Sequence, residues 1–434
     1  MTPKLADVLA GCIGFFYPVW KPADLKSEPQ RGYIRLTDEG LIQIDTLEED
    51  LLRSFAGNSN RSIPKWIIGQ TQHGTVMLTD IIGFGSTVNI GGTRASVYRY
   101  RCQSMVFGIG AGMPKSPKLT KASVFLPDIT TWAGLSAVDV QHDVGSNNRY
   151  KGISIKVEAV PPHAIKATKG RHLELGTHWE VSGSESRRTV YTPLQVTCSS
   201  SRPQYVYDLL EPIFYLQDLA NIAYQGAIVG DGGRAEVPNS DVSRAPQFWN
   251  HALMFRLPSA IPPKSMTELP LFHLTDIDGI NGVRRWVNLC ARHPRAVNPV
   301  TRSFRLGPAS PEVQMMDVAA GIEYWTAAHA RTAKWSKVRP QSLAVAGRAG
   351  KAFSDWVGDA DKWADQFWDE YNAIKHRPNQ MLDPRRAILF AESGRILLTC
   401  VLLKRVALRN AIIEKILDSH RLNQLGEDTR KLVL

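Results

Sequence analysis

The sequence predicts an α+β protein with an N-terminal β-rich region, a mixed middle region and a C-terminal α-helical bundle. Before about residue 310, short apolar runs with the two-residue period of a strand alternate with turn residues, which is typical of a sandwich or a barrel-like domain. After that point, long stretches of good helix formers carry apolar stripes with helical spacing. We therefore expect three parts: a β-rich part over 1–200, a mixed, partly helical part over 201–310, and a helical bundle over 311–434.

The strands expected in the first part are short and bounded by turn residues, and His73-Gly74 between two of them is typical of a hairpin turn. Their expected ranges are 32–36, 66–71, 75–79, 95–100, 123–125, 152–159, 178–182 and 189–197. In the middle part, 205–223 presents one broad apolar face and predicts a helix. The stretch 230–243 is rich in glycine and polar residues, which favours an exposed loop.

Four helices are expected in the bundle. The first two span 311–337 and 341–357, and the third begins at Asp359 or Asp361, since acidic residues suit a helix N-terminus. The third helix ends at Arg377, because Pro378 follows it, and the fourth runs from 385 to about 418. Glu323 lies beside the apolar face of the first helix, so we expect it to pair with an arginine or lysine of the third or fourth helix.

The net charge of +11 on 434 residues favours a polyanionic partner, of which nucleic acid is the commonest. The five cysteines are far apart in the sequence and form no Cys-x-x-Cys pair, which argues against a zinc site and a disulfide framework. The histidines follow no metal-ligand spacing, so no metal or other cofactor is expected. The longest apolar run, 396–403, is too short to span a membrane, and the N-terminus lacks a signal-peptide pattern. These patterns predict a cytoplasmic protein.

A polar pair at the end of the third bundle helix is the strongest candidate for chemistry. Asn372 and His376 are four residues apart and therefore project from one helix face. Histidine exchanges a proton near neutral pH, and Lys375 and Arg377 beside it could hold a phosphate. This combination suits cleavage of an RNA backbone. A cap residue and a surface histidine would give the same pattern, so both interpretations stay open on spacing alone.

An aromatic set on the second and third bundle helices could stack bases, but its helical spacing favours the core. Its members are Trp356, Trp363, Phe367 and Trp368.

The C-terminal bundle resembles a HEPN domain, and the N-terminal part resembles the β-rich domain of ApeA-type anti-phage defence proteins. The second resemblance rests on motifs at 32–36, 67–79, 106–108 and 122–132. HEPN ribonucleases act as dimers without a metal, and their signature is an arginine, an adjacent polar residue, three further residues and a histidine. Asn372 and His376 fall on the polar and histidine positions. Tyr371 stands where the family has the arginine that holds the scissile phosphate.

The resemblance implies a HEPN-type, metal-independent endoribonuclease that acts as an abortive-infection effector, or toxin, with an N-terminal domain that senses or regulates. It implies His376 and Asn372 as catalytic residues and Lys375, Arg377 and Tyr371 as the phosphate-binding set. The implied partners are RNA, with tRNA one candidate, a second copy of the chain joined through the bundle, and a phage-encoded trigger protein. The departure at Tyr371 keeps an alternative open, in which the HEPN module is catalytically degenerate and binds RNA, a nucleotide or a protein without cleaving.

Overall fold

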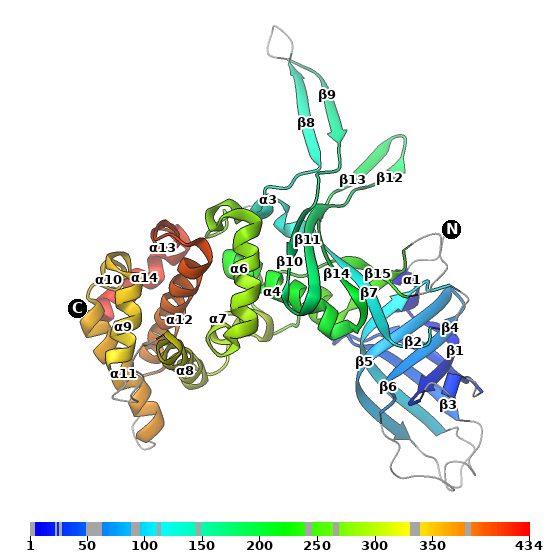
Figure 1. Cartoon of the computed structure of the whole chain (residues 1–434), viewed down its shortest axis with the longest axis horizontal. Coiled ribbons are helices and arrows are strands. Elements are labelled where there is room, and N and C mark those ends of the chain that lie inside the picture. Colours follow the sequence, from blue (N-terminus) through cyan, green and yellow to red (C-terminus); the bar gives the residue numbers. More distant parts are fainter. Residues whose placement is uncertain are drawn as a thin grey trace. The chain divides into compact units, whose positions relative to one another are not determined.

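The computed structural model describes residues 5–21, 24–25, 28–48, 63–87, 96–110, 114–144, 149–238, 245–263, 269–329, 339–377 and 383–434. They form two compact units. The first comprises Met1–Pro127, Ser136–Phe214 and Val229–Leu257, and the second comprises Asp128–Leu135, Tyr215–Ile228 and Pro258–Leu434. The first unit is mainly β and the second mainly α (Figure 1), which confirms the predicted α+β class. The boundaries predicted at residues 200 and 310 stay predictions, because compactness in space does not define domains along the chain.

Six antiparallel strands of the first unit close into a ring, in the order β6-β3-β2-β1-β4-β5 with β5 pairing back onto β6. Their bounds are β1 Cys12–Val19, β2 Gln30–Leu36, β3 Ile42–Glu48, β4 Trp66–Thr71, β5 Gly74–Thr87 and β6 Ser96–Phe107. Alternate side chains, among them Phe16, Ile44 and Tyr100, fill the interior as one apolar cluster. The barrel-like prediction is thus confirmed, and so is the hairpin turn at His73-Gly74, where Thr71 pairs with Gly74.

The sheet continues from β6 through six further strands. They are β16 Gln247–Asn250, β15 Gly232–Glu236, β7 Lys118–Leu126, β14 Leu194–Tyr205, β11 Arg171–Thr177 and β10 His163–Lys166. The exposed loop predicted over 230–243 is therefore wrong where β15 lies, and its residues 239–243 lie outside the described residues. Gly233 allows β15 to pair closely with β7 because it lacks a side chain. A Cβ at this position would lie 2.3 Å from the Ser123 carbonyl oxygen.

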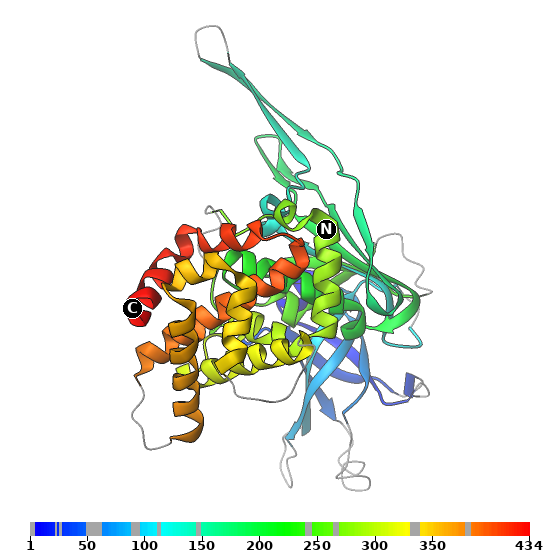
Figure 2. The same ribbon diagram turned by 60° about the vertical axis from the view of Figure 1, so that its left-hand side comes forward.

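Two hairpins project from this sheet in both views of the molecule (Figures 1 and 2). They are β8 Val138–Val144 with β9 Tyr150–Val157, and β12 Glu180–Ser184 with β13 Arg187–Tyr191. The strand predicted over 189–197 is split between β13 and β14. Pro193 lies at this break, because it has no N–H to donate to a strand ladder.

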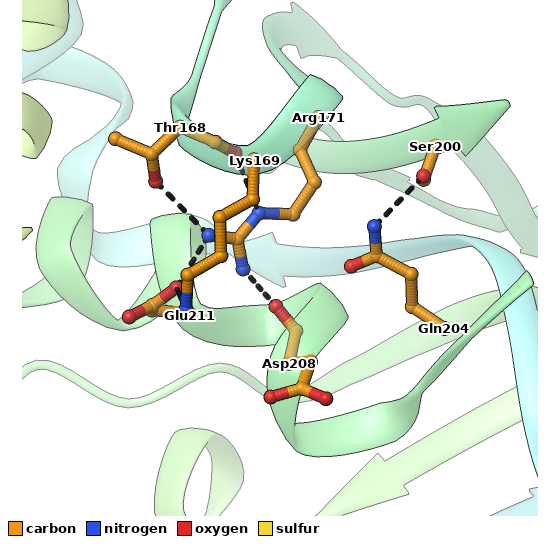
Figure 3. Close-up of polar contacts among 7 residues, drawn as sticks. All are labelled: Thr168, Lys169, Arg171, Ser200, Gln204, Asp208 and Glu211. Atoms are coloured by element: carbon orange, nitrogen blue, oxygen red, sulfur yellow. Dashed lines mark hydrogen bonds and ion pairs between the residues drawn. The ribbon is translucent and has the colours of Figure 1, made fainter. Parts of the chain in front are cut away.

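Helix α4 (Val206–Tyr224) confirms the helix predicted over 205–223. Pro212 lies inside it and has no N–H, so the Asp208 carbonyl oxygen lacks its usual donor from the next turn. The fully buried Arg171 of β11 supplies that donor through Nη1 (Figure 3). Arg171 also donates to the Thr168 carbonyl oxygen and pairs with Glu211. An arginine from a distant strand therefore supplies the hydrogen bond that the proline cannot donate within the helix.

The second unit consists of helices. The longer ones are α6 Gly279–Arg292, α7 Pro294–Leu306, α8 Pro311–His329, α9 Arg339–Ala349, α10 Lys351–Val357, α11 Ala360–His376, α12 Pro384–Ala407, α13 Ala411–Leu417 and α14 His420–Val433. Shorter helices among the described residues include α1 Leu5–Leu9, η2 Pro127–Ile129, α3 Thr130–Ala133, η3 Thr168–Gly170, α5 His251–Met254 and η4 Leu274–Ile277.

Two predicted bundle helices are interrupted. The helix expected over 341–357 breaks at Gly350, where φ is +77°, and the helix expected over 385–418 ends where Leu408 adopts a left-handed φ of 59°. The helix expected over 311–337 is described as far as His329, and residues 330–338 lie outside the described residues.

Helices α8 and α12 lie side by side and run in the same direction. Val318 of α8 faces Gly394 of α12, and one turn later in both helices Gly321 faces Leu398, so the two helices run parallel. The two glycines allow the close approach, since an added Cβ at either position would lie within 2.9 Å of the facing side chain. The C-terminal ends of α8 and α12 therefore lie at the same end of the bundle.

Candidate nucleic-acid site at the end of α11

Helix α11 begins and ends where its sequence predicts. The Asp359 carboxylate accepts hydrogen bonds from the backbone N–H groups of Asp361 and Lys362, at 2.9 and 3.0 Å, and so caps the N-terminus. His376 is the last helical residue, and the N–H of Arg377 closes the final turn on the Ala373 carbonyl oxygen at 3.0 Å. This confirms the predicted third helix, while Pro378 lies outside the described residues.

The predicted polar residues gather on the last turns of this helix. Asn372 is half-buried, and Lys375, His376 and Arg377 are exposed. Asn372 and His376 share one face because they are four residues apart in a regular helix. The structure therefore brings an amide, an imidazole and two cations to one solvent-facing helix end, where a large anion can reach them.

Tyr371 lies in the protein core instead of beside the exposed set. It is 4% exposed, and its ring meets Trp368 edge to face with centroids 4.9 Å apart. Its hydroxyl oxygen lies 3.4 Å from Lys375 Nζ, which is also 5.4 Å from the centre of the tyrosine ring. Tyr371 thus holds the Lys375 ammonium at the end of the helix rather than presenting a charge of its own.

A partly buried ion pair joins α11 to α12 next to these residues. Arg386 Nε donates to Glu370 Oε2 at 2.9 Å, and Arg386 Nη2 donates to Gln366 Oε1 at 3.1 Å. The sequence analysis missed this pair and expected one at Glu323, which forms no ion pair within the described residues. Glu370 follows Trp363 and Phe367 at helical spacing, and this pattern could have identified it as a carboxylate on an apolar face.

The aromatic set of α10 and α11 belongs to the core, as expected. Trp356, Trp363, Phe367 and Trp368 are each at most 6% exposed. Trp363 Nε1 donates to Ser393 Oγ of α12 at 3.0 Å. These rings therefore position α11 against α12 and are not available for stacking on bases.

Among the described residues, no three or more His, Cys, Asp and Glu side chains gather as a metal ion would need. In the same part of the chain, every helix is too short or too polar to cross a bilayer. All five cysteines are free and buried.

Two family models match the chain. The model of ApeA N-terminal domain 1 matches residues 11–286, and the model of the Apea-like HEPN domain matches residues 319–411. The second range contains the whole of α11 and of α12. No curated protein and no solved structure matches the chain.

Proposed function

The chain belongs to the ApeA N-terminal domain 1 family and carries an Apea-like HEPN domain, and from this premise we propose that it is a metal-independent endoribonuclease. Membership of this family indicates an anti-phage defence effector with a HEPN module. In our proposal the module cleaves RNA during abortive infection, and the N-terminal domain senses a phage product or regulates the nuclease.

One observation supports this proposal above the others. Asn372 and His376 share a face at the exposed end of α11, with Lys375 and Arg377 next to them, inside the segment that matches the HEPN model. An imidazole that can exchange protons beside two fixed positive charges meets the two needs of phosphodiester cleavage: proton transfer and stabilisation of charge on phosphorus.

The proposed reaction is an in-line attack of the ribose 2′-hydroxyl on the adjacent phosphorus. His376 takes the proton of the hydroxyl while the 2′-oxygen bonds to phosphorus. The bond from phosphorus to the 5′-oxygen breaks, and a second imidazole, His376 of the partner subunit, protonates the leaving oxygen. The products are a 2′,3′-cyclic phosphate and a 5′-hydroxyl. Lys375 and Arg377 stabilise the pentavalent intermediate, and Asn372 positions the phosphate.

Dimerisation through the bundle completes this proposed site. Each chain contributes one Asn372 and one His376, so two copies facing one cleft provide the base and the acid that the reaction needs. In this arrangement Tyr371 acts indirectly by holding the Lys375 ammonium, in place of the arginine of the HEPN signature.

A second candidate function is binding without cleavage, and the burial of Tyr371 favours it. The HEPN signature places an arginine at this position, whereas the side chain here is an uncharged ring packed on Trp368. A degenerate module of this kind would hold RNA, a nucleotide or a partner protein through Lys375 and Arg377.

Incubation of the full chain with labelled tRNA and mRNA in EDTA tests both functions. We expect discrete fragments ending in 2′,3′-cyclic phosphate, and a loss of rate of about 100- to 10,000-fold in His376→Ala. Lys362→Ala, an exposed lysine at the other end of α11, is the matched control and should cut normally.

A folded His376→Ala variant that cuts at the normal rate would refute the assignment of His376. Salt-dependent RNA binding with no product, in infected-cell extract as well as in buffer, would favour the binding module. In that case Lys375→Ala should weaken RNA binding and Lys362→Ala should not.

A further inference from the structure

A second cluster of polar side chains lies where α6, α7 and α8 meet. His293 connects α6 to α7, and its Nδ1 lies 3.1 Å from the hydroxyl oxygen of Tyr324 on α8. The ring of His329, the last residue of α8, lies 5.4 Å from the His293 ring and 3.9 Å from that of Trp325, centre to centre. Both imidazoles are half-buried, so they are held in place and still reach solvent.

The His329 ring has a defined tautomer. Its Nδ1 lies 3.0 Å from the Trp325 carbonyl oxygen, which can only accept, so this nitrogen bears the proton. Nε2 of the neutral ring is then free for a ligand or a further proton.

Four arginines from four different helices lie near His293, Tyr324 or His329. Arg348 Nη2 donates to the His329 carbonyl oxygen at 3.4 Å, and the Arg295 guanidinium lies 5.4 Å from the centre of the Tyr324 ring. Arg292 and Arg405 act electrostatically on His293, and Arg405 with Arg348 acts on His329. The four residues are Arg292 of α6, Arg295 of α7, Arg348 of α9 and Arg405 of α12.

Among the described residues, none of the four arginines forms an ion pair with Asp or Glu. Burial lowers the pKa of His293 and His329, and the neighbouring positive charges lower the pKa of each further. A bound anion would stabilise such a set of cationic and imidazole groups, because it would supply the negative charge that they lack.

The cluster is separate from the end of α11. Arg386 contacts Glu370 of α11 near the start of α12, whereas Arg405 lies near the end of α12. Nineteen residues of helix separate these arginines, which corresponds to about 28 Å along the axis. The two histidines therefore cannot share a single phosphate with His376 of the same chain.

We propose that His293, Tyr324, His329, Arg348 and Arg405 form a second binding site, which holds a phosphate group. Planar guanidinium groups match the oxygens of phosphate with paired N–H donors. A bound anion also favours protonation of His329 Nε2, which then donates a further hydrogen bond. The same chemistry would recognise a phosphodiester of RNA or the phosphate of a free nucleotide. The inference does not rest on cleavage at α11.

The test is a binding titration of the full chain in a His376→Ala background, so that RNA stays intact. The probes are inorganic phosphate, AMP and a short oligoribonucleotide, in a buffer without phosphate. Arg405→Gln removes one exposed guanidinium of the cluster and should raise Kd about tenfold for the probe that binds. Arg284→Gln is the matched control, because Arg284 is an exposed arginine of α6 two turns before Arg292.

The control should leave Kd unchanged within about twofold, and circular dichroism should show both variants folded. Binding of AMP or inorganic phosphate would assign the site to a free phosphate compound. Binding of the oligoribonucleotide alone would assign it to an RNA backbone. An unchanged Kd in Arg405→Gln, or equal losses in both variants, would overturn the proposal, since general basic charge would then explain any binding.

Discussion

Replacing Arg171 with methionine should locally destabilise the first turns of α4. The substitution keeps an unbranched apolar stem in a fully buried position and removes every guanidinium contact. Those contacts reach Thr168, the Asp208 carbonyl oxygen and Glu211 (Figure 3). The Asp208 carbonyl is the critical one, because Pro212 cannot donate to it.

The size of the free-energy loss follows from the two groups that Arg171→Met leaves without their arginine partner, Glu211 and the Asp208 carbonyl oxygen. Removing one partner of a buried ion pair costs about 3–5 kcal/mol. Glu211 is 24% exposed and still lies 3.4 Å from Lys169 Nζ, so its carboxylate keeps part of its hydration and one cation. The lower limit therefore applies to the pair, at about 3 kcal/mol. The orphaned Asp208 carbonyl adds about 1 kcal/mol.

Hydrogen exchange measured by mass spectrometry on peptides from α4 reports this local opening free energy. We expect a loss of about 4 kcal/mol in Arg171→Met. His172→Met, on the neighbouring exposed position of β11, is the control and should change little. Pro212→Ala restores an N–H to the Asp208 carbonyl, so in the Arg171→Met background it should recover about 1 kcal/mol. A loss below about 1 kcal/mol, or an equal loss in His172→Met, would refute the reasoning.

Three further predictions concern stability and reactivity. Leu408 is 69% exposed and adopts a left-handed φ of 59° at the end of α12. Leu408→Gly should therefore raise the free energy of unfolding in urea by about 1 kcal/mol, and a lower urea midpoint would contradict this. Burial, and then the neighbouring charges of Arg292, Arg348 and Arg405, lower the pKa values of His293 and His329 in the fold. Their neutral rings therefore stabilise the fold fully above the unfolded pKa of about 6.5, and this contribution is lost as pH falls below that value and through the lower folded pKa. The urea midpoint should thus decrease when the pH is lowered from 7.5 to 5.5, and it should decrease less in a His293→Asn, His329→Asn double variant. An equal decrease in the wild-type protein and the double variant would exclude this pair as the cause. Burial raises the pKa of Cys198 and of Cys400 to about 12. A thiol reagent at pH 8 should therefore modify these two cysteines only after denaturation. Rapid labelling of either cysteine in the native protein would contradict this, because it would show that solvent reaches the thiol.

The candidate site could be predicted because its signals are local. An acidic cap at Asp359, a proline at 378 and helical spacing between them define α11 without reference to the rest of the chain. The four-residue separation of Asn372 and His376 then places them on one face by helix geometry alone. Similarly, the period-two runs and the turn at His73-Gly74 predict strands of the ring.

Predictions failed where one residue overrode a longer pattern. Pro193 divides a stretch that otherwise alternates like a single strand, and Leu408 ends a helix whose apolar stripe continues beyond it. The stretch that contains β15 is polar and rich in glycine, yet Gly233 lets it pair closely with β7. At 189–197 and 385–418 the local pattern indicated the right type of element but the wrong extent. Only at β15 did the local composition indicate the wrong type, because pairing with β7 decided the outcome.

The sequence by itself determined the class of fold, the limits of α11 and the residues at its end, since caps, periodicity and i to i+4 spacing act within a few residues. Only the tertiary structure decided which distant residues complete one another. Arg171 supplies the donor that Pro212 withholds, Arg386 pairs with Glu370, and His293 meets His329 among arginines of four helices. The physical reason is that a buried polar group must find a partner wherever packing places one, and separation along the chain does not specify that partner.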